Sequence, residues 1–177
     1  PGFPKLSQYS DILAKDGVRL GLIGPREVER IWDRHILNCA ALAELIPDGQ
    51  SIIDIGSGAG LPGIVLAILK PESKVTLIEP MQRRTDFLTQ VTSDLGLTNV
   101  EIIRGRAETQ KVKAQIVTSR AVAPLNKLIA WSLPLVEKGG KVLAIKGEKA
   151  QEELEEAKKE LVSLKGSTAT IKTCGLA

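Results

Sequence analysis

The chain has 177 residues, of which 43% are hydrophobic, 25% charged and 3% aromatic. These proportions are typical of one globular domain with an aliphatic core, and no apolar run approaches the roughly 20 residues of a membrane span. The net charge is only +3, but ten basic and three acidic residues lie between Arg104 and Lys149. This excess of seven positive charges predicts a surface that attracts phosphate groups.

The first 50 residues are expected to form an N-terminal helical extension. Glycines at positions 17, 21 and 24 indicate loop in the first 24 residues. A helix is expected from Pro25 to Ile46, because proline suits a first helical turn and apolar side chains then recur at steps of three and four. The segment 47–49, Pro-Asp-Gly, ends this helix.

Strands and helices alternate from Ser51 onward. We expect strands at 51–55, 74–79, 100–104, 115–119, 141–145 and 167–173, and helices at 62–69, 81–95, 124–136 and 151–164. Gly139-Gly140 is expected to turn the chain, and Glu155 and Lys159 to support the last helix at i,i+4. This alternation predicts an α/β fold, a doubly wound and mostly parallel sheet covered on both faces. We therefore expect one domain over 1–177, with a Rossmann-like core at 51–177.

A glycine loop, Gly56-Ser57-Gly58-Ala59-Gly60, follows the first strand of this core. Ligands of open α/β sheets bind beyond the carboxyl ends of the strands, and glycines let the backbone approach them closely. Residues 58–63 even match the dinucleotide fingerprint GxGxxG. Asp54, however, stands where a dinucleotide fold has an apolar residue, and a carboxylate suits an ammonium group better than a pyrophosphate.

Glu79 is the second acidic marker, at the end of the second strand and 25 positions after Asp54. A carboxylate at that place can accept hydrogen bonds from both hydroxyls of a ribose. Asp54 and Glu79 together favour S-adenosylmethionine as the cofactor. A nicotinamide-dependent reductase that uses the same loop is the first alternative.

Four motifs occur in a fixed order. They are Trp32–Asn38 (WDRHILN), Asp54–Gly63 (DIGSGAGLPG), Ser119–Ala123 (SRAVA) and Ala144–Gly147 (AIKG). With them the chain resembles the bacterial 16S ribosomal RNA guanine-N7 methyltransferase G family, also called glucose-inhibited division protein B, from about Tyr9 to the end. The resemblance implies a class I S-adenosylmethionine-dependent methyltransferase fold. It also implies, as methyl acceptor, a guanine in the decoding-region loop of 16S RNA, in free RNA or in the small ribosomal subunit.

The resemblance also implies site residues. Together with the loop and strand-end residues, the expected cofactor contacts are Asp54, Gly56, Gly58, Gly60, Leu61, Glu79, Ala107, Glu108 and Arg120. Arg120 is the expected catalytic residue as well. Asn38 stands where the family has Asp, which puts a charged role there in doubt. The segment 109–114 is shorter than the corresponding loop of the family, so we expect further residues in this loop. The fold also calls for a seventh, antiparallel strand, which we expect after Ala177. Because the chain begins with Pro1 rather than Met, we expect further residues before it as well.

The chemistry expected of guanine N7 needs no general base, because its lone pair is free at neutral pH. Catalysis would consist of aligning the base with the methyl group, and a base in an A-form stack would first be extruded. The residues expected to contact RNA phosphates are Arg104, Arg106, Lys127, Lys146 and Lys149. His35 is expected to be a core histidine bonded to backbone, and Arg34 to tie the extension to the sheet.

The remaining expectations concern alternative functions, metal binding and the location of the protein in the cell. A non-catalytic RNA-binding protein on the same fold is the second alternative, and a small-molecule or protein substrate the third. One histidine and two distant cysteines, Cys39 and Cys174, predict no metal site. Unpaired thiols fit a reducing compartment, so we expect a cytoplasmic protein. We also expect a monomer, and no membrane contact because no apolar run is long enough.

Overall fold

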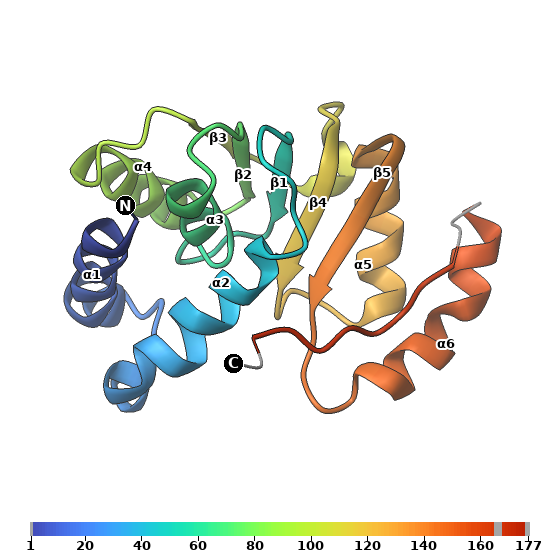
Figure 1. The fold of residues 1–177 in the computed structure, drawn as a ribbon, viewed down its shortest axis with the longest axis horizontal. Coiled ribbons are helices and arrows are strands. Elements are labelled where there is room, and N and C mark those ends of the chain that lie inside the picture. Colours follow the sequence, from blue (N-terminus) through green and yellow to red (C-terminus); the bar gives the residue numbers. More distant parts are fainter. Residues whose placement is uncertain (1, 165–167, 176–177) are drawn as a thin grey trace.

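A five-stranded parallel sheet forms the centre of the protein (Figure 1). The structure, a computed structural model, describes residues 2–164 and 168–175. The strands are β1 (Ile52–Ile55), β2 (Val75–Glu79), β3 (Val100–Arg104), β4 (Ala114–Arg120) and β5 (Val136–Ile145). Their order is β3-β2-β1-β4-β5, so the chain changes direction across the sheet between β1 and β4. Such a switch point is where open α/β sheets bind ligands.

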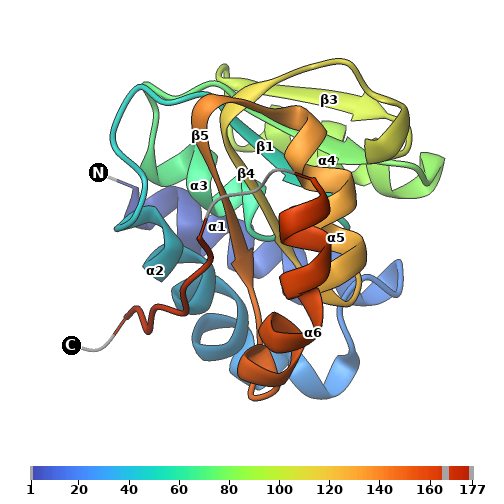
Figure 2. The same cartoon turned by 90° about the vertical axis from the view of Figure 1, so that its right-hand side faces the viewer.

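Helices cover both faces of this sheet (Figures 1 and 2). One face carries α1 (Phe3–Ile12), α2 (Asn38–Ala43), α3 (Gly63–Leu69) and α4 (Gln82–Asp94), and the other carries α5 (Leu125–Ser132), beside which α6 (Ala150–Ser163) packs. Strand residues alternate between two apolar cores, as a pleated sheet requires. In β1, for example, Ile52 belongs to the core under α1–α4, whereas Ile53 and Ile55 belong to the core on the α5 side. The predicted doubly wound sheet is confirmed.

The N-terminal extension is helical over residues 3–19, so the loop predicted for the first 24 residues is wrong over that range. It is confirmed only at 20–24, where the chain turns at Gly21. Leu6, Tyr9 and Leu13 are buried on one side of α1 and of the π-helical turn η1 (Leu13–Gly17). The packing of these side chains on the core outweighs the tendency of nearby glycines to form a loop. The helix predicted for 25–46 is confirmed as helical but divides into a 3₁₀ segment, η2 (Pro25–Arg30), a π-helical segment, η3 (Trp32–Leu37), and α2.

Gly139 and Gly140 do not turn the chain but lie inside β5. The pairing of β5 with β4 shifts between Ala114 and Ile116, so β5 bulges at this point. Gly139 has φ +85°, and a Cβ on Gly140 would lie 2.4 Å from the carbonyl oxygen of Gln115. The two glycines therefore serve a bulge, where only residues without a side chain fit.

The end of the chain differs from the prediction too. Of the strand predicted at 167–173, Ser167 lies outside the described residues, and residues 168–173 have no regular secondary structure. This segment is exposed and leads back toward α2, where Gly175 lies against Ala41 (Figure 1). In α6, Glu155 pairs with Lys158 rather than with Lys159.

The remaining short elements are the 3₁₀ turns η4 (Ala107–Thr109) and η5 (Leu133–Leu135). Within residues 2–164 and 168–175, no helix combines the length and apolar character needed to cross a bilayer. In the same residues, no three His, Cys, Asp or Glu side chains gather as ligands of a metal ion.

Candidate cofactor site

A cavity of about 410 Å³ opens at the carboxyl ends of β1 to β4. Its volume lies in the range of roughly 300–1,000 Å³ that is usual for small-molecule sites. The residues that line it lie at the ends of strands β1 to β4, come soon after these ends, or belong to α4 or α5. They are Ile55, Gly56, Ile78, Glu79, Pro80, Met81, Arg84, Gly105, Arg106, Ala107, Glu108, Ala121, Val122 and Trp131. An apolar wall with two carboxylates and two guanidinium groups is suited to a ligand that has both an aromatic and a polar part.

Gly56 marks the point where the glycine loop meets the turn after β4. Its φ is +64°, and a Cβ at this position would lie 2.9 Å from Cγ2 of Val122. The neighbouring Ala121 has φ +53°, a left-handed conformation that costs a residue with a Cβ about 1–2 kcal/mol. The wall formed by Ala121 and Val122 is thus strained and closely packed against the loop, as is common at binding sites.

Glu79 holds the glycine loop from the end of β2. Its carboxylate is 1% exposed and accepts hydrogen bonds from the N–H groups of Gly58 and Met81, each at 3.0 Å. The guanidinium of Arg84 lies 3.6 Å from the same carboxylate. Because each carboxylate oxygen has two lone pairs, Glu79 retains acceptor capacity toward the cavity that it lines.

Asp54 supports the loop from beneath rather than lining the cavity. Its side chain is fully buried, and its Oδ2 accepts a hydrogen bond from the Gly63 N–H at 3.0 Å. The other oxygen, Oδ1, is buried without a hydrogen-bond partner among the described residues. Burial raises the pKa of this carboxyl to about 7. Asp54 thus bonds to the first amide of α3, shortly after the glycine loop, and its contact with an ammonium group stays a prediction.

Some of the other residues predicted to contact the cofactor line the cavity, and some do not. Like Gly56 and Glu79, both Ala107 and Glu108 line the cavity. Gly58, Gly60 and Leu61 do not, and Leu61 is buried in the core under α1–α4. No motif indicates Met81, Arg84 or Trp131, and Val122 stands in the SRAVA motif with no role predicted for it. Met81 and Val122 lie two positions after Glu79 and Arg120, so the strand ends could have pointed to them, but Trp131 reaches the cavity only through the packing of α5.

Arg120 turns away from the cavity toward the N-terminal extension. Its guanidinium donates to the Arg34 carbonyl oxygen at 3.1 Å and to Nδ1 of His35 at 2.6 Å, and Nη1 lies 3.9 Å from Sγ of Cys39. Arg120 therefore joins the extension to the sheet, the role predicted for Arg34. The side chain of Arg34 instead pairs with Glu27 at 3.4 Å.

His35 is buried, as predicted, but its ring bonds to side chains and not to backbone, so that part of the prediction is wrong. Its Nε2 lies 3.1 Å from a carboxylate oxygen of Glu27, and its Nδ1 faces Arg120. Burial lowers the pKa of His35, and the nearby Arg120 charge lowers it further.

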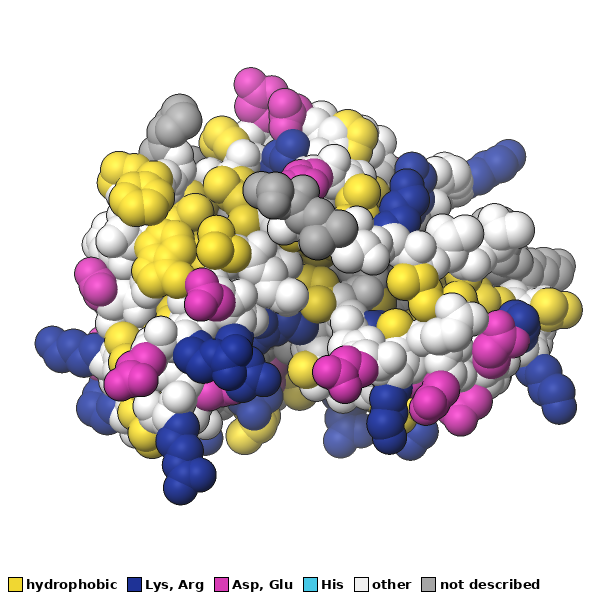
Figure 3. Space-filling view, turned by 60° about the horizontal axis from the view of Figure 1, so that its bottom comes forward, with side chains coloured by type: hydrophobic (Ala, Val, Ile, Leu, Met, Phe, Trp, Pro, Cys, Tyr) yellow, Lys and Arg dark blue, Asp and Glu magenta, His cyan; other side chains and the backbone are white. Residues whose placement is uncertain are grey.

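The five predicted phosphate contacts lie at or after the carboxyl ends of strands, on the same edge as the cavity. Arg106, Lys127 and Lys149 are exposed, and Arg106 lines the cavity itself. Arg104 hydrogen-bonds to Gln82, and Lys146 pairs with Glu153 at 2.6 Å. On the face shown in Figure 3, Lys and Arg side chains are interspersed with Asp and Glu rather than forming one continuous basic patch.

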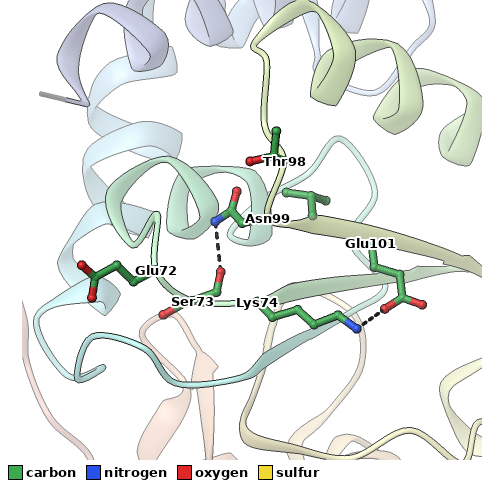
Figure 4. A pocket seen from close by; sticks show the side chains of 7 residues that line it. Glu72, Ser73, Lys74, Thr98, Asn99 and Glu101 are labelled. Carbon is green, nitrogen blue, oxygen red and sulfur yellow. Dashed lines mark hydrogen bonds and ion pairs between the residues drawn. The ribbon is translucent and has the colours of Figure 1, made fainter.

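A second cavity, of about 300 Å³, lies at the opposite edge of the sheet, before β2 and β3 (Figure 4). Lys74 and Glu101 form an ion pair at 2.8 Å on its rim. The Asn99 side chain donates to the carbonyl oxygens of Ala67, Lys70 and Ser73. These bonds tie together the turn between α3 and β2, which is a structural role.

Comparisons with known proteins agree with this geometry. A family model described as rRNA small subunit methyltransferase G (GidB) matches residues 3–177. The ribosomal RNA small subunit methyltransferase G of Thermobifida fusca is 56% identical over 170 residues, which cover 95% of this chain and 72% of that protein. The protein of the same name from Mycolicibacterium gilvum is 50% identical over 180 aligned residues, covering 99% of this chain and 79% of that protein.

Among solved structures, the fold is similar to that of M. jannaschii TYW2 in complex with AdoMet. The TM-score is 0.63 at 19% identity, and the match covers 76% of this chain and 64% of that chain. At this identity the likeness concerns the fold alone. The sheet and its helices have the Rossmann-like fold of class I methyltransferases, as the four sequence motifs implied.

Proposed function

This chain belongs to the rRNA small subunit methyltransferase G (GidB) family, and from that premise we propose that it transfers a methyl group from S-adenosylmethionine to N7 of a guanine in 16S ribosomal RNA. The observation that carries the proposal is the cavity at the carboxyl ends of β1 to β4, bounded by Gly56 and Glu79. It lies at the switch point of the sheet, in a chain that shares half of its residues or more with relatives of that name.

The residues of the cavity fit S-adenosylmethionine. Ile78 and Ala107 offer an apolar surface for an adenine ring, with Glu108 beside it. Glu79 has acceptor capacity left for ribose hydroxyls after binding two backbone N–H groups. Gly56 has no Cβ, so Val122 can lie directly against the glycine loop and form the cavity wall there. The bound cofactor supplies a methyl group on a positively charged sulfur.

The protein's own contribution to the reaction is alignment. Guanine N7 has a free lone pair, so no side chain has to remove a proton before attack. Both ring nitrogens of His35 are bonded, one to Glu27 and the other to Arg120, so His35 does not act as a general base. Holding the base in line with the methyl group is then the main source of acceleration.

We place the RNA on the edge that carries Arg106, Lys127 and Lys149, because these side chains are exposed and follow the carboxyl ends of strands, the edge at which the cavity opens. Lys146 contributes less, since Glu153 compensates its charge. Phosphate contacts of this kind make binding salt-dependent and position the RNA without reading its sequence. We further propose that the protein acts as a monomer in the cytoplasm.

Two titrations and one transfer assay test this proposal. Calorimetry should detect binding of S-adenosylmethionine and none of NADH, which separates a methyltransferase from the reductase alternative. Tritium transfer from labelled S-adenosylmethionine should reach 16S RNA in deproteinised ribosomal RNA or in small subunits. Cofactor binding without any transfer would favour the non-catalytic RNA-binding alternative and contradict the proposal.

A further inference from the structure

The protonation state of His35 follows from its two neighbours. A guanidinium group can only donate hydrogen bonds, so Nδ1 of His35, 2.6 Å from the Arg120 guanidinium, has to accept. In the neutral ring the single proton then sits on Nε2, which donates to Glu27 at 3.1 Å. Only this tautomer satisfies both partners, and a protonated ring would turn a second donor toward Arg120.

Within residues 2–164 and 168–175, the Arg120 guanidinium has three partners, and all are uncharged groups of the extension. They are the ring of His35, the carbonyl of Arg34 and the thiol of Cys39. No ion pair among the described residues includes Arg120, so neutral hydrogen bonds, not a carboxylate, fix its direction. Its position therefore depends on His35 presenting an acceptor.

The residues after Arg120 form the cavity wall. Ala121, with φ +53°, and Val122 line the cavity, and Val122 lies against Gly56 of the glycine loop. A strained backbone persists only where its surroundings hold it. The fixed guanidinium of Arg120 is the anchor on one side of this strained turn.

We propose that Glu27, His35 and Arg120 form a triad through which the N-terminal extension sets the cavity wall at Ala121 and Val122, with His35 as its positioning residue. This inference rests on the proposed function, because the wall it sets is that of the S-adenosylmethionine cavity. In this proposal the N-terminal extension contributes to the cofactor site and does not only pack on the sheet.

Protonation of His35 is the condition that breaks the triad. The charged groups that face the ring are Glu27 from η2, Arg120 from β4 and Arg34 from its own segment, with the Cys39 thiol beyond Arg120. A proton on Nδ1 removes the acceptor and places two positive charges together. Affinity for S-adenosylmethionine should therefore fall in mildly acidic buffer as His35 becomes charged.

His35 is the single histidine of the chain, so one nitrogen NMR spectrum of the untagged protein reports on it alone. We expect the Nε2–H tautomer, a midpoint below that of a free histidine, and a higher midpoint in Arg120→Gln, which removes the opposing charge. A proton on Nδ1 at neutral pH, or a midpoint that Arg120→Gln leaves unchanged, would overturn the triad. These measurements do not depend on methyl transfer.

Two substitutions of His35 then separate positioning from mere packing. His35→Asn keeps an acceptor near the place of Nδ1, whereas His35→Gln keeps a donor near the place of Nε2. Calorimetry should give His35→Asn an affinity for S-adenosylmethionine within about threefold of the wild type, and His35→Gln a loss of about tenfold, which is the effect of roughly one hydrogen bond. In methyl transfer the loss should lie in KM for S-adenosylmethionine rather than in kcat.

The pH profile completes the test. The affinity of the wild type should fall in acid, and that of His35→Asn should stay level over the same range. Equal losses in the two variants with equal falls in melting temperature would show a packing role only and overturn the proposal. A wild type that binds S-adenosylmethionine but methylates no RNA would refute the proposed function and leave the triad standing.

Discussion

Gly56→Ala should lower both the stability of the protein and its affinity for the cofactor, by more than alanine at a glycine in an ordinary turn. Gly56 has φ +64°, and the new Cβ would lie 2.9 and 3.0 Å from the two Cγ atoms of Val122. Two costs follow, one from the left-handed backbone and one from the displaced wall of the cavity. The first is about 1–2 kcal/mol for a residue with a Cβ, and the second about 1–3 kcal/mol, as for an overpacked interior.

Two other glycines separate these costs. Gly58 and Gly96 have φ +58° and +56°, but a Cβ on Gly58 would meet only the Gly56 carbonyl oxygen at 3.8 Å, and one on Gly96 would meet nothing within 4 Å. Alanine at either position therefore carries the backbone cost alone. We expect urea denaturation to show a loss of about 1–2 kcal/mol for these two variants and about 2–5 kcal/mol for Gly56→Ala.

Cofactor affinity is the second readout of this experiment. Val122 has to move in Gly56→Ala, so calorimetry should show at least about tenfold weaker binding of S-adenosylmethionine, which corresponds to 1.4 kcal/mol. Gly96→Ala, at the end of α4, should bind like the wild type. If Gly56→Ala and Gly96→Ala lose equal stability and both bind normally, the contact between Gly56 and Val122 has no part in the site.

Tyr9→Phe removes the buried hydroxyl that donates to the Ala59 carbonyl oxygen at 2.8 Å, so thermal denaturation should show a loss of about 1–3 kcal/mol, and an unchanged melting temperature would argue against this anchor. Asn99→Ala, at the opposite edge, should cost about 1–3 kcal/mol while leaving affinity for S-adenosylmethionine unchanged. The pKa of Asp54 is raised to about 7 in the folded protein, so its contribution to stability is full below about pH 4 and is lost as pH rises through 7. Asp54→Asn should therefore remove a fall in the free energy of unfolding between those pH values, and identical pH profiles of variant and wild type would contradict the assignment.

The sheet and its order of elements follow from local patterns. The buried run at 52–55 and the glycines after it identify β1 and the ligand-binding edge without any tertiary knowledge. Glu79 can be predicted as a site residue in the same way, because it ends the second strand of the alternating pattern. What these residues share is that their role is fixed by neighbours close in the sequence.

The rest depends on contacts between distant segments. Helix α1 contains no strong local signal, and its buried face exists because Tyr9 reaches the loop at Ala59. Gly139 and Gly140 look like a turn until the pairing of β5 with β4 shows a bulge. Arg120 stands in a motif that implies cofactor contact, but its side chain turns to His35, 85 positions away.

The most direct test of this account is to map N7-methylguanine in 16S RNA after incubation with the wild-type protein and S-adenosylmethionine. The RNA should come from cells that lack the endogenous enzyme, and Gly56→Ala should be run in parallel as the variant with a damaged cavity. The account predicts one methylated guanine in the decoding-region loop with the wild type and much less with the variant. No new N7-methylguanine, or a methyl group on another atom of the RNA, would contradict it.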